Sequence, residues 1–434
     1  MTKILKLPLL AGLGLVAAAP AFAQEAAPHT GYIFNTLLFL IGGILVFWMA
    51  AGFAMLEGGL VRSKNVTMQM TKNVALFSIA AIMYYLIGYG VMYPGEWAIN
   101  GWLGEIFSAA SLEEVGGAGD ITYASTGSDF FFQLMFCATT ASIVSGTIAE
   151  RVKLWPFLIF TVLLTGLIYP IEASWQWGGG WLSEAGFSDF AGSTLVHAAG
   201  GFAALAGAIV LGPRFGKYNK AGQVIPLPGS NLPLATLGTF ILWLGWFGFN
   251  GASQLAMGTI SDVTDVSRIF ANTNTAAAGG AVAVLVLTQI LYKKPDLTMM
   301  LNGALAGLVS ITAEPLTPSL GAATLIGAVG GVIVVFAVPM LDRLRIDDVV
   351  GAIPVHLIAG IWGTLAVVLT NPETSITAQL TGIVAIGVFV FAISFATFWV
   401  LKLVMGVRVS EEDEVNGLDW AEMGMEAYPE FTNG

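Results

Sequence analysis

Apolar residues along this chain run in long stretches that short polar segments separate. A helix needs about 20 apolar residues to cross the hydrocarbon core of a bilayer. Beyond residue 23, eleven stretches approach or reach that length. They are Tyr32–Leu56, Asn73–Met92, Phe130–Ile148, Leu154–Ile171, Ala191–Leu211, Leu234–Met257, Ile269–Leu291, Leu297–Thr312, Gly321–Met340, Val349–Leu369 and Leu380–Val404. The pattern predicts an all-α polytopic membrane protein with eleven transmembrane helices.

The first 23 residues have a different pattern. A basic start and a short apolar stretch, Ile4–Ala19, precede the tripeptide Ala21-Phe22-Ala23, which has the A-x-A form of a cleavage site. We therefore predict a cleaved signal peptide over residues 1–23 and a mature chain that starts at Gln24 outside the cytoplasm. An uncleaved first helix is the alternative.

The basic residues test this topology. With the mature N-terminus outside and eleven spans, every Lys and Arg of the mature chain except Arg268 falls on the cytoplasmic side. Cytoplasmic loops of membrane proteins carry such an excess of Lys and Arg. The pattern favours a bacterial inner (cytoplasmic) membrane protein with a periplasmic N-terminus and a cytoplasmic C-terminus.

Composition excludes several classes of protein. Hydrophobic residues make up 56% of the 434 and charged residues only 10%, less than half the average for globular domains. The net charge is −11, and without a basic cluster nucleic-acid binding is not expected. The single cysteine, Cys137, excludes a disulfide scaffold. The 53 glycines predict closely packed membrane helices, since small residues let helices approach.

Two histidines lie in matching surroundings. Residues 189–201 and 348–360 both read D-x2-G-x3-V-H-x3-G, with the histidines at His197 and His356. Each copy begins the last span of a five-span half, so the halves have opposite orientations, as in an inverted-topology repeat. Eight residues separate each aspartate from its histidine, about 12 Å of helix. We therefore predict a five-plus-five inverted repeat with a peripheral eleventh helix, and both imidazoles together near mid-membrane.

Ionisable residues inside a membrane are functional candidates. The two imidazoles could be axial haem ligands, part of a metal site, or the lining of a path in which they exchange protons and hydrogen bonds. They could also be buried neutral side chains bonded to carbonyl groups. Metal binding has little support, because no third His or Cys stands at a spacing expected for zinc.

Longer motifs around the first histidine resemble a known family. Residues 189–214 are similar to the signature of the ammonium transporter family (Amt, Mep and Rh proteins). Residues 245–250, 149–151 and 177–180 resemble shorter family motifs. The resemblance extends over nearly the whole mature chain. It implies a homotrimer in the lipid bilayer with one pore per subunit, conducting ammonium or ammonia, with no enzymatic activity and no cofactor.

The resemblance also assigns roles to individual residues. Trp177, Phe136 and Ser253 would recruit ammonium on the external side, and Phe136 with Phe249 would form a gate below. The pore would contain His197, His356, Trp246 and Phe132, and Asp189 would order the external site. Ammonium would lose a proton at the recruiting site and cross as ammonia. The sequence leaves two alternatives open, neutral ammonia conduction and separate transfer of the proton.

Two further features of the sequence bear on function: the C-terminal tail and two departures from the family pattern. We assign residues 24–407 to the transporter domain and 408–434 to a cytoplasmic regulatory tail; PII-type signalling proteins commonly bind that face in the family. Gly351 stands where some members carry an acid, and Leu357-Ile358 where small residues are frequent. A bis-histidine redox protein, and a sensor or neutral-gas channel on the same fold, are the rival hypotheses.

Overall fold

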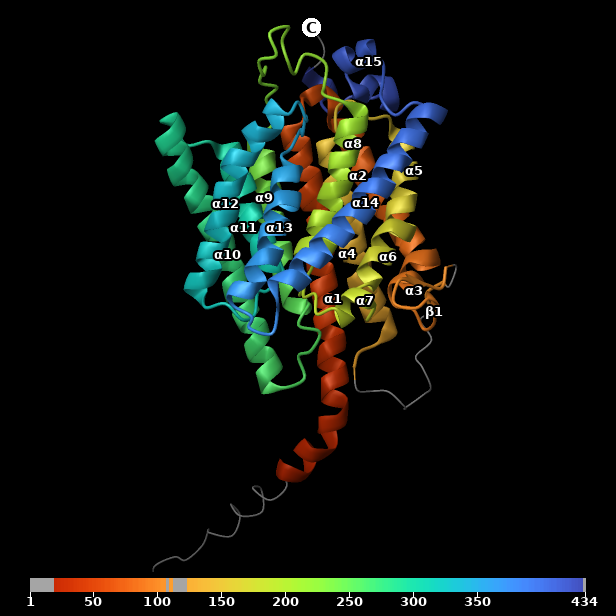
Figure 1. Cartoon of the computed structure of the whole chain (residues 1–434), viewed down its shortest axis with the longest axis vertical. Coiled ribbons are helices and arrows are strands. Elements are labelled where there is room, and N and C mark those ends of the chain that lie inside the picture. The colour runs from red at the N-terminus through yellow and green to blue at the C-terminus, as the bar shows by residue number, and fades with distance from the viewer. Residues whose placement is uncertain (1–18, 107–108, 112–122, 432–434) are drawn as a thin grey trace, which may run out of the picture.

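The computed structural model describes residues 19–106, 109–111 and 123–431. Its helices form one elongated bundle (Figure 1). The only strands in the described part are β1 (Trp97–Ile99) and β2 (Leu103–Gly104), a small antiparallel pair. Most of the predicted signal peptide, residues 1–18, lies outside the described residues, and its last residues begin the first helix. Cleavage therefore stays a prediction.

The first half of the bundle contains the helices up to residue 211. They are α1 (Ala19–Leu60), η1 (Ser63–Asn65), α2 (Val66–Met83), η2 (Tyr84–Gly88), α3 (Tyr89–Met92), α4 (Thr126–Thr147), α5 (Leu154–Leu163), η3 (Leu164–Ile168), α6 (Tyr169–Ser174), α7 (Trp181–Glu184), η4 (Ser193–Ala198) and α8 (Ala199–Leu211). Three of these segments, η2, η3 and η4, are π-helical turns within longer helices.

The second half and the tail contain the remaining helices. They are α9 (Leu232–Ala252), α10 (Ile260–Tyr292), α11 (Leu297–Thr312), α12 (Leu320–Arg343), η5 (Ile353–Ile358), α13 (Ala359–Ala366), η6 (Val367–Leu369), α14 (Ile376–Val404), α15 (Glu411–Asn416), η7 (Asp419–Met423) and η8 (Pro429–Phe431). The turn η5 is again π-helical.

These helices confirm an all-α polytopic membrane protein. In the described residues, nine helical segments are long and apolar enough to cross a membrane, and two shorter apolar ones, Leu297–Thr312 and Ile353–Leu369, coincide with the predicted eighth and tenth stretches. The predicted boundaries were less accurate. The helix α10 starts at Ile260 rather than near Ile269, because a capping box of Thr259 and Asp262 begins it in a polar segment that hydropathy does not detect.

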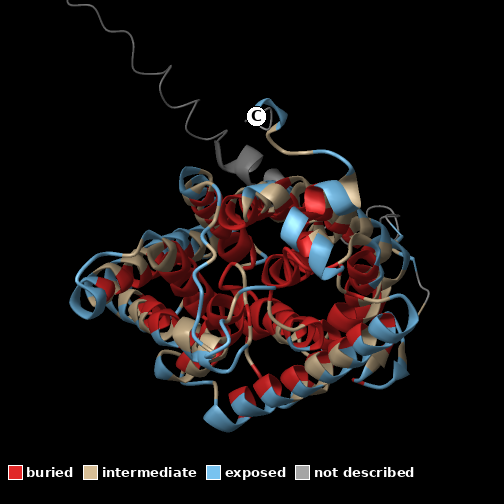
Figure 2. Ribbon diagram, turned by 90° about the horizontal axis from the view of Figure 1, so that it is seen from above, coloured by how far each residue is buried: buried red, intermediate tan, exposed pale blue. Residues whose placement is uncertain are grey.

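Repeat-related helices pack against each other. The helix α1 packs on α9, and η4 with α8 contacts η5 with α13. Small residues make other contacts close: a Cβ atom on Gly327 of α12 would overlap the backbone of Ala276 in α10. Buried faces turn inward and exposed faces outward around the bundle (Figure 2). The last membrane-spanning helix, α14, runs obliquely across the outside of the bundle (Figure 1), as expected for a helix outside the repeat.

The bundle has two ends, which we name by what lies there. At the tail face, the segment from Arg408 to the end of η8 packs beside the ends of the helices (Figure 1). At the opposite end, the vestibule face, α3, α7 and the strand pair lie together. The span that contains His197 begins at the vestibule face, whereas the span that contains His356 begins at the tail face. The two halves therefore run in opposite directions, as predicted.

Candidate functional site

Each histidine follows a tight turn that an aspartate organises. Asp189 accepts hydrogen bonds from the backbone N–H groups of residues 192–195, at 2.7–3.0 Å. Asp348 accepts from Gly351 at 3.1 Å and from Ile353 at 2.7 Å. The glycine three residues after each aspartate has a positive φ, 103° at Gly192 and 82° at Gly351, which side chains with a Cβ rarely adopt. This backbone requirement is a physical reason for glycine at position 351.

A π-helical turn follows each glycine and positions the imidazole. The turns η4 and η5 bring the Nδ1 atoms of His197 and His356 to 3.1 Å, with ring centroids 5.2 Å apart. Both side chains are buried. One Nδ1 must donate and the other accept, so the two rings hold different tautomers. The Nε2 atom of His197 makes no hydrogen bond within the protein. The predicted meeting of the two histidines is confirmed.

An aromatic column continues from His197 toward the vestibule face. The rings of Trp246 and Phe249 lie 5.0 and 5.2 Å from the imidazole of His197. Trp246 is held in place because its Nε1 donates to Thr312 Oγ1 at 2.8 Å. Phe249 lies 4.2 Å from Phe136, the closest ring contact in the column. Together these rings separate the two histidines from the open space at the vestibule face.

Phe136 lines a cavity of about 400 Å³ at the vestibule face, and Phe249 packs against Phe136 on the side toward the histidines. The residues that line the cavity are Tyr89, Tyr93, Tyr123, Asp129, Phe132, Gln133, Phe136, Trp177, Phe190, Ser253 and Leu255. Ser253 donates its hydroxyl proton to Phe249 O at 2.7 Å, and Trp177 donates its Nε1–H to Asp189 O at 3.0 Å. Ser253 therefore keeps an acceptor oxygen, and Trp177 offers an aromatic ring rather than a donor. This chemistry suits a small cation.

On the other side of the histidines lies a cavity of about 10 Å³, room for about one water molecule. His356, Phe53, Asn302 and Glu57 are among its lining residues. The Oε2 atom of Glu57 accepts hydrogen bonds from Asn73 at 2.7 Å, from Ser145 at 3.1 Å and from Gln69. This polar cluster joins α1, α2 and α4. Leu357, by contrast, packs against Gly201 of α8 in the core.

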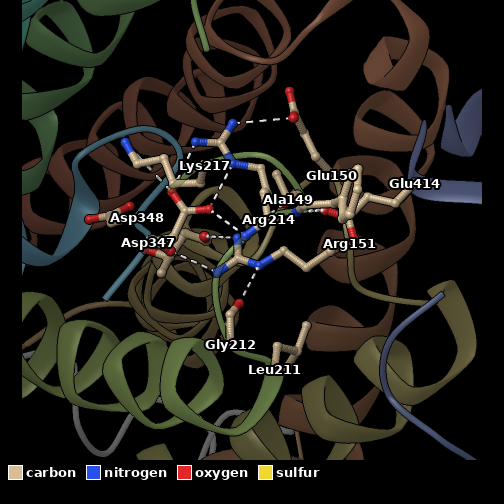
Figure 3. A network of polar contacts seen from close by, with 12 residues as sticks. Ala149, Glu150, Arg151, Leu211, Gly212, Arg214, Lys217, Asp347, Asp348 and Glu414 are labelled. Atoms are coloured by element: carbon tan, nitrogen blue, oxygen red, sulfur yellow. Dashed lines mark hydrogen bonds and ion pairs between the residues drawn. The ribbon is translucent and has the colours of Figure 1, made fainter. Parts of the chain in front are cut away.

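A network of charged residues covers the tail face (Figure 3). Arg214 forms ion pairs with Asp347 at 2.8 Å and with Glu150 at 3.2 Å, and Glu150 also forms an ion pair with Arg62 at 2.6 Å. Burial opposes ionisation of Asp347, but the hydrogen bonds from Arg214 and the nearby Arg151 hold the pKa of Asp347 well below its usual range. The network connects the loops of both halves next to Asp348, which starts the turn of His356.

The tail is tied to this network and to the first loop. Glu414 pairs with Arg408 at 2.8 Å and accepts from the backbone N–H of Phe215 at 2.5 Å. Asn65 accepts from Leu418 N at 3.0 Å, and Asp419 accepts from Met68 N at 2.8 Å. These bonds place α15 and η7 against the start of α2.

The structure brings every predicted site residue into one continuous arrangement. Phe132, Phe136, Trp177 and Ser253 line the vestibule cavity, Phe249 and Trp246 lie beneath it, and the histidines follow. Sequence reasoning missed other residues of the arrangement. Asp129 and the three tyrosines line the vestibule, Thr312 holds Trp246, and Glu57 lies below His356. Asp129 had a signal, because it precedes Phe132 and Phe136 on one helix face; the tyrosines had none.

Comparisons with known proteins agree with this geometry. The Ammonium Transporter Family matches residues 37–428. The chain is 42% identical to the ammonium transporter Amt2 of Archaeoglobus fulgidus, over 90% of this chain and 87% of that protein. It is 35% identical to the ammonium transporter of Bacillus subtilis, over 91% and 98% of the two chains.

Solved structures with the same fold include two proteins of this kind. A sensor Amt protein superimposes with a TM-score of 0.83 at 34% identity, covering 90% of this chain and 98% of its own. Mep2 of Candida albicans has a TM-score of 0.79 at 27% identity, covering 92% and 91%. Family match, relatives and fold agree, and the chain is a member of the ammonium transporter family, a family of transporters and channels rather than enzymes.

Proposed function

We propose that this protein carries ammonium across the membrane by admitting it at the vestibule, removing a proton and conducting ammonia past the two histidines. The observation that carries the proposal is the order of the groups along one line. A cation-attracting cavity comes first, then the closely packed, tilted rings of Phe136 and Phe249, then the hydrogen-bonded pair of His197 and His356.

In this proposal, the aromatic column selects the substrate. A charged group in the hydrocarbon core costs at least about 2.5–3.5 kcal/mol. Ammonium avoids that cost when it releases a proton to the solvent of the open vestibule, whereas potassium has no proton to release, so the apolar gate excludes potassium. Ammonia then meets His197, whose Nε2 makes no hydrogen bond in the protein, and passes along the imidazoles by hydrogen bonding.

The pore role is favoured over the bis-histidine haem hypothesis. Axial ligands point a nitrogen at the iron from opposite sides of a porphyrin. Here the two Nδ1 atoms are hydrogen-bonded to each other and lie 3.1 Å apart. Phe249 and Trp246 both pack on the imidazole of His197. A sensor role on this fold is a second candidate, since one of the similar structures is that of a sensor Amt protein.

The assembly and location follow from the same proposal. We propose a homotrimer in a bacterial inner membrane, with a periplasmic vestibule face and a cytoplasmic tail face. The concentration of Arg62, Arg151 and Arg214 at the tail face supports that orientation. The docked tail, residues 408–434, would regulate transport, and a PII-type signalling protein would be its partner at that face.

The experiment that tests the function is a current measurement on proteoliposomes adsorbed to a solid support. An ammonium pulse should give a transient current, or, for neutral ammonia conduction, a faster internal pH change than in empty liposomes. A potassium pulse of equal concentration should give neither. Equal responses to potassium and ammonium would contradict the selectivity mechanism, and no ammonium response in either assay would leave the sensor as the better candidate.

A further inference from the structure

We propose that Asp129 is a second, outer ammonium-binding group, which concentrates the cation in the vestibule before it reaches the aromatic site at Phe136 and Trp177. The inference deepens the proposed function and rests on it. No charged side chain other than Asp129 lines the vestibule cavity among the described residues. The other lining residues are apolar or uncharged: aromatic rings, the amide of Gln133, and the hydroxyls of Ser253 and three tyrosines.

Asp129 is held in place by neighbouring donors. The hydroxyl of Tyr89 donates to Asp129 Oδ2 at 2.7 Å, and Tyr123 and Gln133 also hydrogen-bond to the carboxylate. These partners are neutral, so they orient the charge without cancelling it. No Lys or Arg forms an ion pair with Asp129 in the part of the chain that the structure describes. A cation that enters the cavity is therefore the natural counterion.

The position of Asp129 on α4 sets its distance from the gate. Asp129, Gln133 and Phe136 stand at i, i+4 and i+7, one face of a helix. Seven residues of helix correspond to about 10 Å along the axis. Asp129 therefore lies near the first turn of α4, about 10 Å outward from Phe136. This separation makes it an earlier binding position rather than a part of the aromatic site itself.

Several polar groups around the cavity already donate their protons to other protein atoms. This favours a ligand that donates hydrogen bonds and does not need to accept them. Tyr89 donates to Asp129, Ser253 donates to Phe249, and Trp177 donates to Asp189. These three groups therefore present lone pairs and π faces to a ligand, beside the carboxylate of Asp129. Ammonium has only N–H donors and a positive charge, so it matches these acceptors, whereas the carboxylate repels an anion.

Coulomb's law gives the size of the effect. A unit charge about 10 Å away changes the occupancy of the aromatic site by about 2-fold in a water-like medium and by about 15-fold at the effective dielectric constant of a protein surface. Salt screens this interaction, since the Debye length falls from about 30 Å at 0.01 M to about 3 Å at 1 M. The proposed role therefore has a salt-dependent signature.

The test compares Asp129→Asn with wild-type protein in proteoliposomes, measuring ammonium transport at low and high concentrations of a bulky organic salt. At low salt we expect the KM for ammonium to rise about 2- to 15-fold, with the maximal rate nearly unchanged. At 1 M salt the difference in KM should shrink toward unity. Glu373→Gln is the matched control, because it removes an exposed carboxylate on the same face outside the cavity and should leave the KM unchanged.

A second variant separates charge from structure. Tyr89→Phe removes the hydrogen bond to Asp129 but keeps the carboxylate, so it should retain the salt dependence of the KM. If Asp129 only ties α3 to α4, both variants should lower the maximal rate and neither should change the salt dependence. That result, or an unchanged KM in Asp129→Asn, would overturn the inference while wild-type transport stands. Loss of transport in the wild type would instead refute the proposed function.

Discussion

At the scale of single residues, the two aspartates do more than mark the repeat. Asp189 lies in the loop before η4, and its carboxylate is the acceptor for four consecutive backbone N–H groups. Only the ionised form can accept all of them, because a proton on one oxygen turns that oxygen into a donor. The position of His197 therefore depends on the charge of a residue eight positions earlier.

This dependence predicts a pH profile. Burial raises the pKa of Asp189 to about 6, although the backbone hydrogen bonds oppose the change. Below that pH the carboxylate gains a proton and the turn loses acceptors, so transport at fixed ammonium concentration should fall as the pH drops through about 6. The raised pKa acts on stability in the opposite direction: this group's contribution to the free energy of unfolding decreases between about pH 4 and 6 as the pH rises.

Transport rates between pH 5 and 8, with thermal unfolding of the same samples in detergent, check both statements. A flat transport profile over that range would contradict the role of Asp189. Asp347 does not complicate the measurement, because its pKa is held so low that it stays ionised over the whole range.

At the scale of elements, buried polar groups connect helices that hydrophobic packing alone would not align. Glu57 of α1 and Lys72 of α2 both bond to Ser145 of α4, through its hydroxyl and its carbonyl respectively. Both charged side chains are almost fully buried. A buried charge that loses its partner is costly, about 3–5 kcal/mol.

We therefore expect Lys72→Met to lower the free energy of unfolding by about 3–5 kcal/mol, measured as denaturant or thermal unfolding of the purified protein. The double variant Lys72→Met/Glu57→Gln should recover part of the loss, since no uncompensated charge remains. Additive losses in this double-mutant cycle would show that the two charges do not interact.

At the scale of the whole molecule, the tail spans the loops of both halves. It contacts the first loop through Lys64 and Asn65 and the loop between the halves through Phe215. The same loop supplies Arg214 to the network beside Asp348. A displacement of the tail can therefore reach the turn that holds His356 through the hydrogen bond between Glu414 and Phe215 and the ion pair of the adjacent Arg214 with Asp347.

Truncation after Val407 tests this connection. We expect the shortened protein to keep the proposed trimeric state by light scattering, because the tail contributes little of the helical bundle, but to transport ammonium more slowly. Unchanged flux would reject a regulatory tail, and a loss of the trimer would assign the tail to assembly instead.

The sequence predicted the architecture well because hydrophobic length and charge asymmetry are strong physical constraints in a membrane. The repeat of aspartate, glycine and histidine also placed the two imidazoles together correctly. Features that arise from three-dimensional packing were not predictable. The π-helical turns η4 and η5 have no local pattern, and Tyr89 reaches Asp129 from 40 residues earlier in the chain.

The central claim is that paired imidazoles beneath an aromatic gate admit only a substrate that can leave its proton. The most direct test replaces both histidines, His197→Ala/His356→Ala, and compares ammonium with potassium currents in proteoliposomes. We predict that the wild type excludes potassium and that the double variant loses its selectivity for ammonium over potassium. Full discrimination against potassium in a folded double variant would contradict it.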